Sequence, residues 1–138
     1  MSTITATFTS PTITATFANL PIANVWSAKT TQALSADDTI AVAHAAISLV
    51  PVEGSGGAVT LTSTPSLQTS GIGTWHIAIV IGTSDTNTVT VQDATNQGGS
   101  ALHLQYARNC TLGKNDCLGL MFNATDSVWI ELFRSENY

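Results

Sequence analysis

The stretch Trp75-His76-Ile77-Ala78-Ile79-Val80-Ile81 has the length and composition of a β-strand. Beyond His76 its residues are apolar and mostly β-branched, which favours a β-strand. Ser84-Asp85-Thr86-Asn87 follows as a turn signal, and the alternating run Val89-Thr90-Val91-Gln92 begins soon after it. A strand, a turn and a second strand are therefore predicted between residues 75 and 92.

Short strands of the same kind are predicted on both sides of this stretch. Their segments are Thr39–Ala43 running on to Ile47–Val50, Val59–Thr62, Leu102–Tyr106, Cys117–Phe122 and Val128–Phe133. From residue 79 onward the strand centres recur every 12 to 15 residues, with Gly, Asn and Asp turns between them. This spacing predicts an all-β fold, either a short-strand β-sandwich or a β-helix-like body, and does not choose between them.

Residues 39–50 also have a helical interpretation, because Ser35 and Asp38 have the spacing of a capping box. The β-branched content of the segment and the proline at position 51 favour an extended chain instead. We therefore predict a strand here.

An internal repeat lies near the start of the chain. Thr3-Ile4-Thr5-Ala6-Thr7-Phe8 recurs nine residues later as Thr12-Ile13-Thr14-Ala15-Thr16-Phe17, and each copy alternates threonine with an apolar residue. Because the offset is odd, a straight strand through both copies would turn their apolar residues to opposite faces. Ser10-Pro11 can bend the chain between them. The copies are predicted either to form a hairpin or to pack as two extended segments on different surfaces.

Glycine and charge divide the chain into two parts. All ten glycines lie between Gly54 and Gly119, and Lys29 is the only charged residue before Asp37. We therefore predict an extended, Thr-rich N-terminal β arm at residues 1–34 and a β-rich body at residues 35–138. The arm either caps the body as a plain hairpin or adds strands to a neighbouring subunit, since it has no edge charges to block pairing.

The chain carries few charges. Of its 138 residues, 4 are Lys or Arg and 9 are Asp or Glu, whereas 35 are Ser or Thr. A net charge of −5 argues against a basic nucleic-acid surface. No apolar stretch approaches the length of a transmembrane helix, and the first residues have neither the basic region nor the apolar core of a secretory signal. We expect no nucleic-acid or membrane partner, and the low charge indicates an assembly.

Several motifs follow one another in the second half of the chain. They are Gly73-Thr74-Trp75-His76-Ile77, Asn87-Thr88-Val89-Thr90-Val91-Gln92-Asp93, Thr111-Leu112-Gly113-Lys114-Asn115-Asp116 and Trp129-Ile130-Glu131-Leu132-Phe133-Arg134-Ser135-Glu136-Asn137. This order resembles a domain that is common in bacteriophage structural proteins, in pieces of tail fibres or tailspikes and in capsid decoration proteins. The resemblance covers about residues 39–138, and the closing Trp129–Asn137 segment is its most specific part. The two cysteines and the Thr-rich arm depart from the pattern.

The resemblance implies a β-rich homotrimer without enzymatic activity in this domain. We therefore expect a virion structural protein, assembled in the host cytoplasm and located on the capsid surface. It would be a decoration or cement protein that binds the major capsid protein on the outer head surface, partly through its arm. The alternative is a tail-fibre or receptor-binding component, whose loops Ser84–Asn87 or Asn96–Gly99 would contact host surface carbohydrate.

The residues expected to contact the capsid or a neighbouring subunit are apolar side chains of the arm and one tryptophan. They are Ile4, Phe8, Ile13, Phe17, Leu20 and Trp26. Burial of such side chains stabilises a contact, and tryptophan often dominates contact energies. Trp75 and Trp129 lie on predicted strands and are expected in the core.

The sequence contains no pattern typical of catalysis or of cofactor binding. His44, His76 and His103 lack the short spacing of a metal motif, so we expect structural histidines. His76 and His103 are placed where neighbouring strands could bring them together, and one histidine per chain on a three-fold axis is the metal alternative. Most acidic residues lie in turns or at strand ends, where they stabilise backbone. We expect neither an enzyme nor a cofactor.

Cys110 and Cys117 flank a turn rich in glycine, asparagine and aspartate. If they face each other across a hairpin, they can form a disulfide. Assembly in a reducing cytosol favours two free thiols instead. Both alternatives stay open on the sequence.

Overall fold

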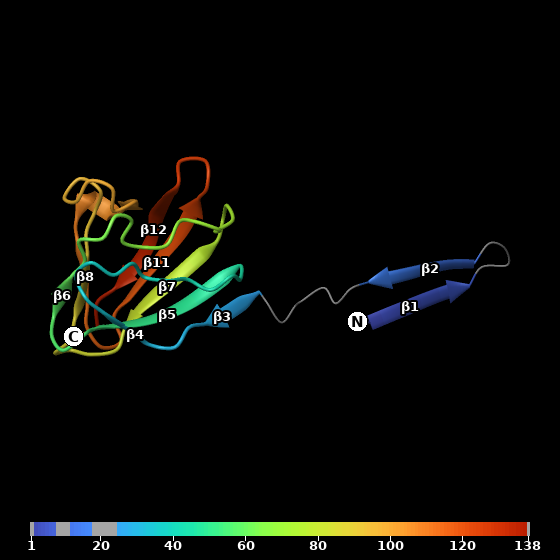
Figure 1. Cartoon of the computed structure of the whole chain (residues 1–138), viewed down its shortest axis with the longest axis horizontal. Coiled ribbons are helices and arrows are strands. Elements are labelled where there is room, and N and C mark those ends of the chain that lie inside the picture. The colour runs from blue at the N-terminus through green and yellow to red at the C-terminus, as the bar shows by residue number, and fades with distance from the viewer. Residues whose placement is uncertain (1, 8–11, 18–24, 138) are drawn as a thin grey trace.

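The computed structural model describes residues 2–7, 12–17 and 25–137 of the chain (Figure 1). The strands are β1 (Ser2–Thr7), β2 (Thr12–Phe17), β3 (Trp26–Ala28), β4 (Gln32–Leu34), β5 (Ile47–Gly54), β6 (Val59–Thr60), β7 (Ile77–Gly82), β8 (Val89–Val91), β9 (Leu102–His103), β10 (Cys110–Leu112), β11 (Cys117–Asn123) and β12 (Val128–Ser135). One short 3-10 turn, η2 (Gln105–Ala107), follows β9. The predicted all-β class is confirmed. In the described residues, no helix is long and apolar enough to cross a membrane.

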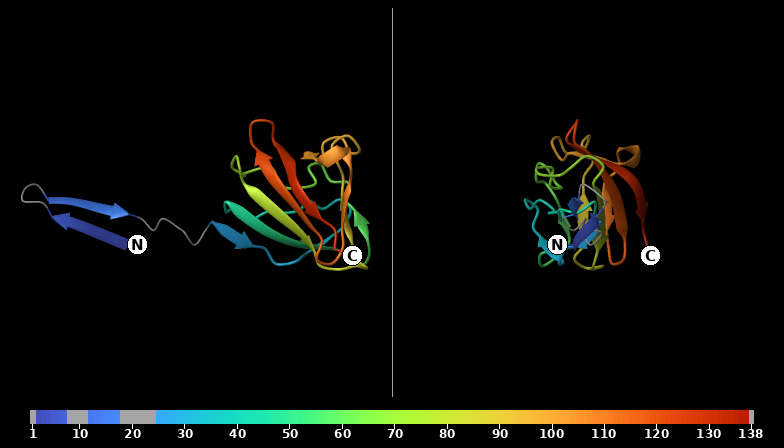
Figure 2. Two further views of the ribbon diagram at one scale, coloured as in Figure 1. Left: turned by 180° about the vertical axis from the view of Figure 1, so that it is seen from behind. Right: turned by 90° about the vertical axis from the view of Figure 1, so that its right-hand side faces the viewer.

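The strands form three sheets. Within the described part of the chain, β1 and β2 pair with each other alone, and β6, β8 and β10 form a three-stranded sheet. The other strands form a mixed seven-stranded sheet in the order β3-β5-β7-β11-β12-β9, with β4 pairing along the same strand, β5, as β3 does. The three-stranded and seven-stranded sheets pack around one core, which is the sandwich alternative of the prediction (Figure 1 and Figure 2).

Strand β7 lies in the middle of the large sheet, parallel to β5 and antiparallel to β11. Its inward residues Ala78 and Val80 are fully or almost fully buried, as are Val50 of β5 and Leu118 of β11. The predicted strand at residues 75–81 is therefore present, but it begins two residues later. Trp75 has a φ of 69°, a left-handed conformation that a strand residue does not adopt.

Two long segments without regular strands, residues 35–46 and 61–76, cross one face of the large sheet (Figure 1). They contribute buried apolar residues, including Ile40 and Leu67, to the core. The strand predicted at residues 39–43 is wrong, because only Ile40 forms a bridge, with Leu67. The next backbone groups bond to a side chain instead, since Gln32 accepts from Ala41 N–H and donates to its carbonyl oxygen.

The predicted boundary between arm and body at residue 34 falls inside the large sheet. β3 and β4 both pair in parallel with β5, and Leu34 is only 4% exposed. Residues 26–34 are therefore part of the body's sheet. This short segment, in which Lys29 is the only charged residue, contains no alternating run long enough to predict two strands, and only pairing with β5 reveals them.

Pro51 lies inside β5, although proline donates no backbone hydrogen bond. Leu49 accepts a bond from the backbone N–H of Lys29, and alternate residues of a strand turn their backbone groups to the same side. Pro51 therefore faces the same edge as Leu49. It lies opposite the interval between the end of β3 at Ala28 and the start of β4 at Gln32, where no ladder bond is needed.

The two copies of the N-terminal repeat pair antiparallel as β1 and β2. The register sets Thr3, Thr5 and Thr7 opposite Thr16, Thr14 and Thr12, and it sets Ile4 and Ala6 opposite Ala15 and Ile13. Directly opposed positions share a face of an antiparallel pair, so the threonine positions of both copies fall on one face. The apolar positions fall on the other. This is the hairpin alternative, and it reconciles the odd offset of the repeat.

Candidate functional site

The face of the seven-stranded sheet that is turned away from the core carries apolar residues on strand after strand. One row of Cα partners crosses β3, β5, β7, β11 and β12 and consists of Trp26, Ile47, Ile77, Met121 and Ile130. Directly opposed residues lie on the same face, and each of these is at least partly exposed. The row is therefore a stripe of large apolar side chains across the sheet.

Two further rows extend this stripe along the strands. The second consists of Ala28, Leu49, Ile79, Gly119 and Phe133, and the third of Pro51, Ile81, Cys117 and Ser135. Leu132 is the additional residue at a bulge between β11 and β12 and is 41% exposed. We call these three rows with Leu132 the outer sheet face.

A glycine in the middle of β11 makes room for an aromatic ring on this face. A Cβ atom at Gly119 would collide with the ring of Phe133, which pairs with it from β12. Gly119 is therefore covered by Phe133, while Phe133 is itself 44% exposed. The ring of Phe133 therefore adds exposed apolar surface at the centre of the outer sheet face.

The three-stranded sheet shows what an ordinary outward face looks like in the same molecule. Its outward positions are threonines: Thr60, Thr90 and Thr111. The hydroxyl oxygens of Thr90 and Thr111 lie 2.8 Å apart and share a hydrogen bond. An antiparallel strand pair that faces water on one side, such as β8 and β10, alternates in this way, and the outer sheet face does not.

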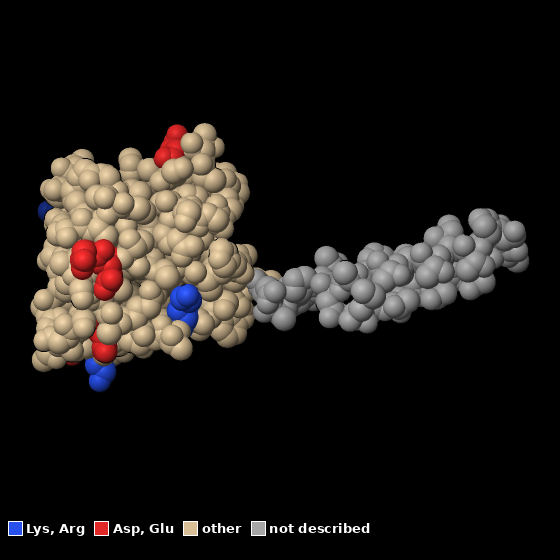
Figure 3. Space-filling model, viewed as in Figure 1, with Lys and Arg blue, Asp and Glu red and all other residues tan. Residues whose placement is uncertain are grey.

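No Lys, Arg, Asp or Glu stands among the residues that define the outer sheet face. Glu53 borders it at the end of β5, where its carboxylate accepts a hydrogen bond from Thr83. His103 borders it on β9, as the partner of Ile130. Charged side chains are sparse on the part of the body that Figure 3 displays as well.

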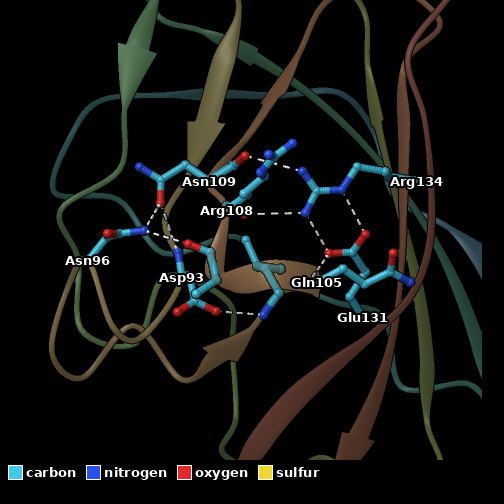
Figure 4. A network of polar contacts seen from close by, with 9 residues as sticks. Asp93, Asn96, Gln105, Arg108, Asn109, Glu131 and Arg134 are labelled. Atoms are coloured by element: carbon cyan, nitrogen blue, oxygen red, sulfur yellow. Dashed lines mark hydrogen bonds and ion pairs between the residues drawn. The ribbon is translucent and has the colours of Figure 1, made fainter.

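On the other side of the sheet, an ion pair anchors the closing strand β12. The guanidinium of Arg134 donates to both carboxylate oxygens of Glu131, at 2.7 Å from Nε and 2.6 Å from Nη2 (Figure 4). It also donates to the carbonyl oxygens of Arg108 and Asn109, at 3.2 Å each. Burial acts to raise the pKa of Glu131, but the hydrogen bonds from Arg134 and from Gln105 N–H outweigh it and lower the pKa.

Asp93 stabilises the loop that leads to β9 in the same way. Its carboxylate accepts hydrogen bonds from the N–H and hydroxyl of Thr95, at 2.8 and 2.7 Å, and from the N–H of Leu104 at 2.7 Å. Burial acts to raise the pKa of Asp93, yet these bonds hold it below its ordinary value. Asp93, the last residue of the motif Asn87–Asp93, therefore stabilises the backbone of this loop.

The turn before β11 is formed by residues of the motif Thr111–Asp116. Asp116 accepts a hydrogen bond from the N–H of Gly113 at 2.8 Å and another from the N–H of Asn137. The side chain of Asn137 donates to the carbonyl oxygen of Asn115, whose φ of 69° asparagine tolerates well. Polar side chains of these motifs thus hold the fold together.

The three histidines do not come together as a site. His76 is buried beside Ser48, with 2.8 Å between Nε2 and Oγ, and its ring meets Trp129 edge-on. The Ser48 hydroxyl donates its one proton to the carbonyl oxygen of Ala43, so His76 Nε2 must be the donor to Ser48. Burial lowers the pKa of His76, with a smaller contribution from His44.

The structure excludes the alternative in which His76 and His103 approach each other across neighbouring strands. His76 precedes β7 and His103 lies on β9, with β11 and β12 between them. Among the described residues, no group of three or more His, Cys, Asp or Glu side chains is placed to hold a metal ion.

Both cysteines are free thiols, so the disulfide alternative is wrong. Cys110 lies in β10, which pairs with β8, whereas Cys117 lies in β11, which pairs with β7 and β12. The two therefore do not face each other across a hairpin. Burial raises the pKa of the Cys110 thiol to about 11, while Cys117 is half-buried on the outer sheet face.

The tryptophans divide between core and surface. Trp129 is completely buried, as predicted, and donates its indole N–H to the carbonyl oxygen of Gln68. Trp26 is 60% exposed, and Trp75, predicted in the core, is 67% exposed. The left-handed backbone at Trp75 places this residue outside β7, beside an open hollow of about 460 Å³ that His44 and Gly73 also line.

The structure places four of the six residues predicted to make contacts. Ile4, Ile13 and Phe17 lie in the strands of the hairpin, and Trp26 lies on the outer sheet face. Phe8 and Leu20 lie outside the described residues. Sequence reasoning missed the outer sheet face itself. Residues 47–52, which are apolar apart from Ser48, and the apolar run at 77–81 do not alternate and could have signalled it.

The two loops considered for carbohydrate contact use polar groups for their own turns. Ser84 Oγ accepts a hydrogen bond from Asn87 N–H at 3.0 Å, and Asp85 accepts one from Lys114 N–H at 2.8 Å. In the other loop, the side-chain amide of Gln97 donates to the carbonyl oxygen of Ser63 at 2.8 Å. These groups are engaged within the body.

Comparisons with known proteins add little. No family model matches the chain, and no curated protein matches it in sequence. A solved structure described as "Structure of a chaperone-substrate complex" is similar over 77% of this chain and 17% of that chain, with a TM-score of 0.45 and 15% identity. The chain therefore spans only a small part of that protein, and a likeness at this level carries no argument about function.

Proposed function

We propose that this protein is a non-enzymatic structural subunit of a bacteriophage virion. In this proposal it is a homotrimeric decoration or cement protein that binds the major capsid protein on the outer head surface, partly through the β1–β2 hairpin. The observation that carries the proposal is the register of this hairpin, which gathers its threonine positions on one face and its apolar positions on the other. The phage-like order of motifs in the body supports the virion context.

The hairpin needs a partner for a physical reason. A two-stranded sheet is marginally stable in water by itself, and its apolar face must be covered to stabilise it. At about 25 cal/mol per Å² of buried apolar surface, a few apolar side chains supply several kcal/mol before ordering costs. Three arms on one trimer bind more tightly than one through avidity, so a clamp across capsid subunits needs no catalysis.

Deletion of residues 2–20 tests the role of the hairpin. We expect the truncated protein to lose binding to purified heads that lack the protein, while it remains a trimer. Two point variants sharpen the test: Ile4→Thr with Ile13→Thr should weaken head binding at least about tenfold, because it removes apolar burial. Thr5→Ser with Thr14→Ser, on the other face, is the matched control. A truncated protein that still decorates heads would refute the proposal.

The number of copies per virion separates this proposal from its alternative. A decoration protein is expected in hundreds of copies, whereas a tail-fibre component is expected in a few to a few tens. Cosedimentation with heads, quantified against the major capsid protein, provides the number.

The second candidate is a tail-fibre or receptor-binding component that contacts host carbohydrate. Exposed Trp75 beside an open hollow favours it, because aromatic faces stack on sugar rings. Binding on a glycan array that Trp75→Ala abolishes would support this candidate. Binding by Tyr106→Ala that equals the wild type is the control, because Tyr106 is an exposed aromatic residue outside the hollow and outside the outer sheet face.

A further inference from the structure

We infer that the outer sheet face is the surface through which copies of this chain associate. The inference deepens the proposed function, because it assigns the contact within the trimer to one surface of the body. It does not depend on head binding, so the two can fail separately. The hairpin would meet the capsid, and the outer sheet face would meet the neighbouring copies.

The composition of the central strands is the first argument. β5 and β7 are a parallel pair, and both are apolar on the two faces along most of their length. Parallel strands with continuous apolar runs are typical of sheets that are covered on both sides. Here the core covers the inner face, and the threonines of the small sheet show that this chain can make an outward face polar. The composition of the outer sheet face is therefore typical of a surface that another part of an assembly covers.

The exposure of its residues is the second argument. Trp26 is 60% exposed, Phe133 44%, Leu132 41% and Ile130 36%. They belong to strands of one sheet whose intervening positions are also apolar, so they are not single apolar residues scattered over a surface. Contiguous apolar patches of this kind mark interaction sites on soluble proteins.

The area suits the core of an interface. With strands about 4.8 Å apart and a rise of about 3.3 Å per residue, five strands and five residues cover roughly 400 Å² in projection. Each partner in a standard interface buries about 800 Å², of which the centre is apolar and the rim polar. The outer sheet face therefore provides the apolar centre, and its polar borders, including Glu53 and His103, provide part of the rim.

Charge identifies a second copy as the partner. Each chain has a net charge of −5, so two copies repel unless they meet where charges are absent. The outer sheet face contains no charged residue, and the same face of another copy matches it in polarity. Three copies of such a face can close around a three-fold axis, which buries the apolar faces without an open end.

Cys117 reports on this contact in the unmodified protein. It lies on the outer sheet face, in the third row, whereas Cys110 is buried in the core. We expect the alkylation rate of Cys117 to rise at least about fivefold when the protein is diluted below its association midpoint, because dissociation uncovers the thiol. Cys110 should stay unreactive throughout and is the internal control. A Cys117 rate that is equal in the oligomer and in the diluted monomer would overturn the inference.

Charge placed on the face is the second test. Ile130→Glu and Trp26→Glu, both at exposed positions, should convert the oligomer into a monomer and lower the association constant at least about a hundredfold. Tyr106→Glu is the matched control, because Tyr106 is 88% exposed but lies outside the outer sheet face. Sedimentation equilibrium measures the masses, and circular dichroism confirms that the variants are folded.

Each outcome of these experiments either supports or overturns the assignment of the contact to the outer sheet face. The inference is overturned if the wild-type protein stays monomeric at about 100 μM, because this concentration is far above the dissociation constants of ordinary stable interfaces. Folded glutamate variants that remain oligomeric overturn it too, and head binding by them leaves the proposed function intact. If deletion of residues 2–20 alone dissociates the oligomer, the hairpin of a neighbour covers the face, and the assignment to body contacts is wrong. A trimer that survives this deletion but not Ile130→Glu supports the inference.

Discussion

Polar side chains in this protein act mainly on neighbouring backbone. Arg134 is the clearest case, because one guanidinium joins Glu131 to the carbonyl oxygens of Arg108 and Asn109 (Figure 4). Glu131 has a completely buried side chain, and its lowered pKa depends on this partner. Removal of one member of such a pair leaves the other charge buried, which costs far more than a surface ion pair would.

Arg134→Met should therefore lower the free energy of unfolding by about 2–4 kcal/mol at pH 7. Wild-type Glu131 has a folded pKa below the unfolded one, so its contribution is present above the unfolded pKa and is lost as pH falls through the folded pKa. In the variant the pKa of Glu131 rises, and protonation relieves the buried charge. The difference between the two proteins should thus shrink as pH falls from 7 to 4 in urea unfolding experiments.

Arg108→Met is the control for this prediction, because the structure uses the backbone of Arg108 in this network and not its guanidinium. It should change the free energy of unfolding by less than about 0.5 kcal/mol. A loss in Arg134→Met that is equal at pH 7 and pH 4 would mean that Arg134 stabilises the fold by packing alone.

Three kinds of strand face occur in this chain. The hairpin β1–β2 separates threonine from apolar positions, and β8 with β10 turns threonine outward over a buried interior. β5 and β7 are apolar on both faces along most of their length. These strand faces differ because some are covered by other parts of the protein and others are in contact with water. The alternation of polar and apolar residues in a single strand indicates which face is covered only when the other face is in water.

Two glycines of the large sheet should respond differently to the same substitution. A Cβ at Gly82, the last residue of β7, would collide with the backbone of Gly113, which the adjacent turn holds in place. A Cβ at Gly119 would collide only with the ring of Phe133, which is partly exposed and can rotate away. Gly82→Ala should cost about 3 kcal/mol and Gly119→Ala about 1 kcal/mol.

Chemical denaturation of the two variants at concentrations where the protein is dissociated measures these costs. Equal losses would show that Phe133 cannot move from Gly119. Tryptophan fluorescence is a suitable signal, since Trp129 lies in the core and leaves it only on unfolding.

At the scale of the whole molecule, net charge opposes assembly while the outer sheet face favours it. Each copy carries −5, and the proposed contact contains no compensating ion pairs. Salt screens repulsion between exposed charges, with a Debye length of about 10 Å at 0.1 M. The association constant should therefore rise several-fold when NaCl increases from about 20 to about 200 mM.

Sedimentation at several salt concentrations checks this prediction. Asp37→Asn, at an exposed position, changes the net charge from −5 to −4 and should weaken the salt dependence. An association constant that falls with salt would indicate ion pairs across the contact and would contradict a charge-free interface.

Local patterns predicted part of this fold well. β7, β11 and β12 were predicted within two residues at either end, because their apolar and β-branched runs are bounded by strong turn residues. β3 and β4 were missed, and residues 39–43 were wrongly predicted as a strand. In each of these cases a partner elsewhere in the chain determines the backbone conformation. The partner is β5 for the two short strands and the side chain of Gln32 for the segment after residue 39.

By itself, the amino-acid sequence determined the all-β class, the repeat of the N-terminal segment and the shortage of charge, because these depend on composition and on neighbours along the chain. Only the tertiary structure decided that Cys110 and Cys117 lie in different sheets and that His76 and His103 are separated by two strands. It also decided that Trp26, Ile77 and Ile130 lie in one row. The pairing of strands distant in sequence sets these relations, since each strand's own alternation does not specify its neighbour or which of its faces is covered.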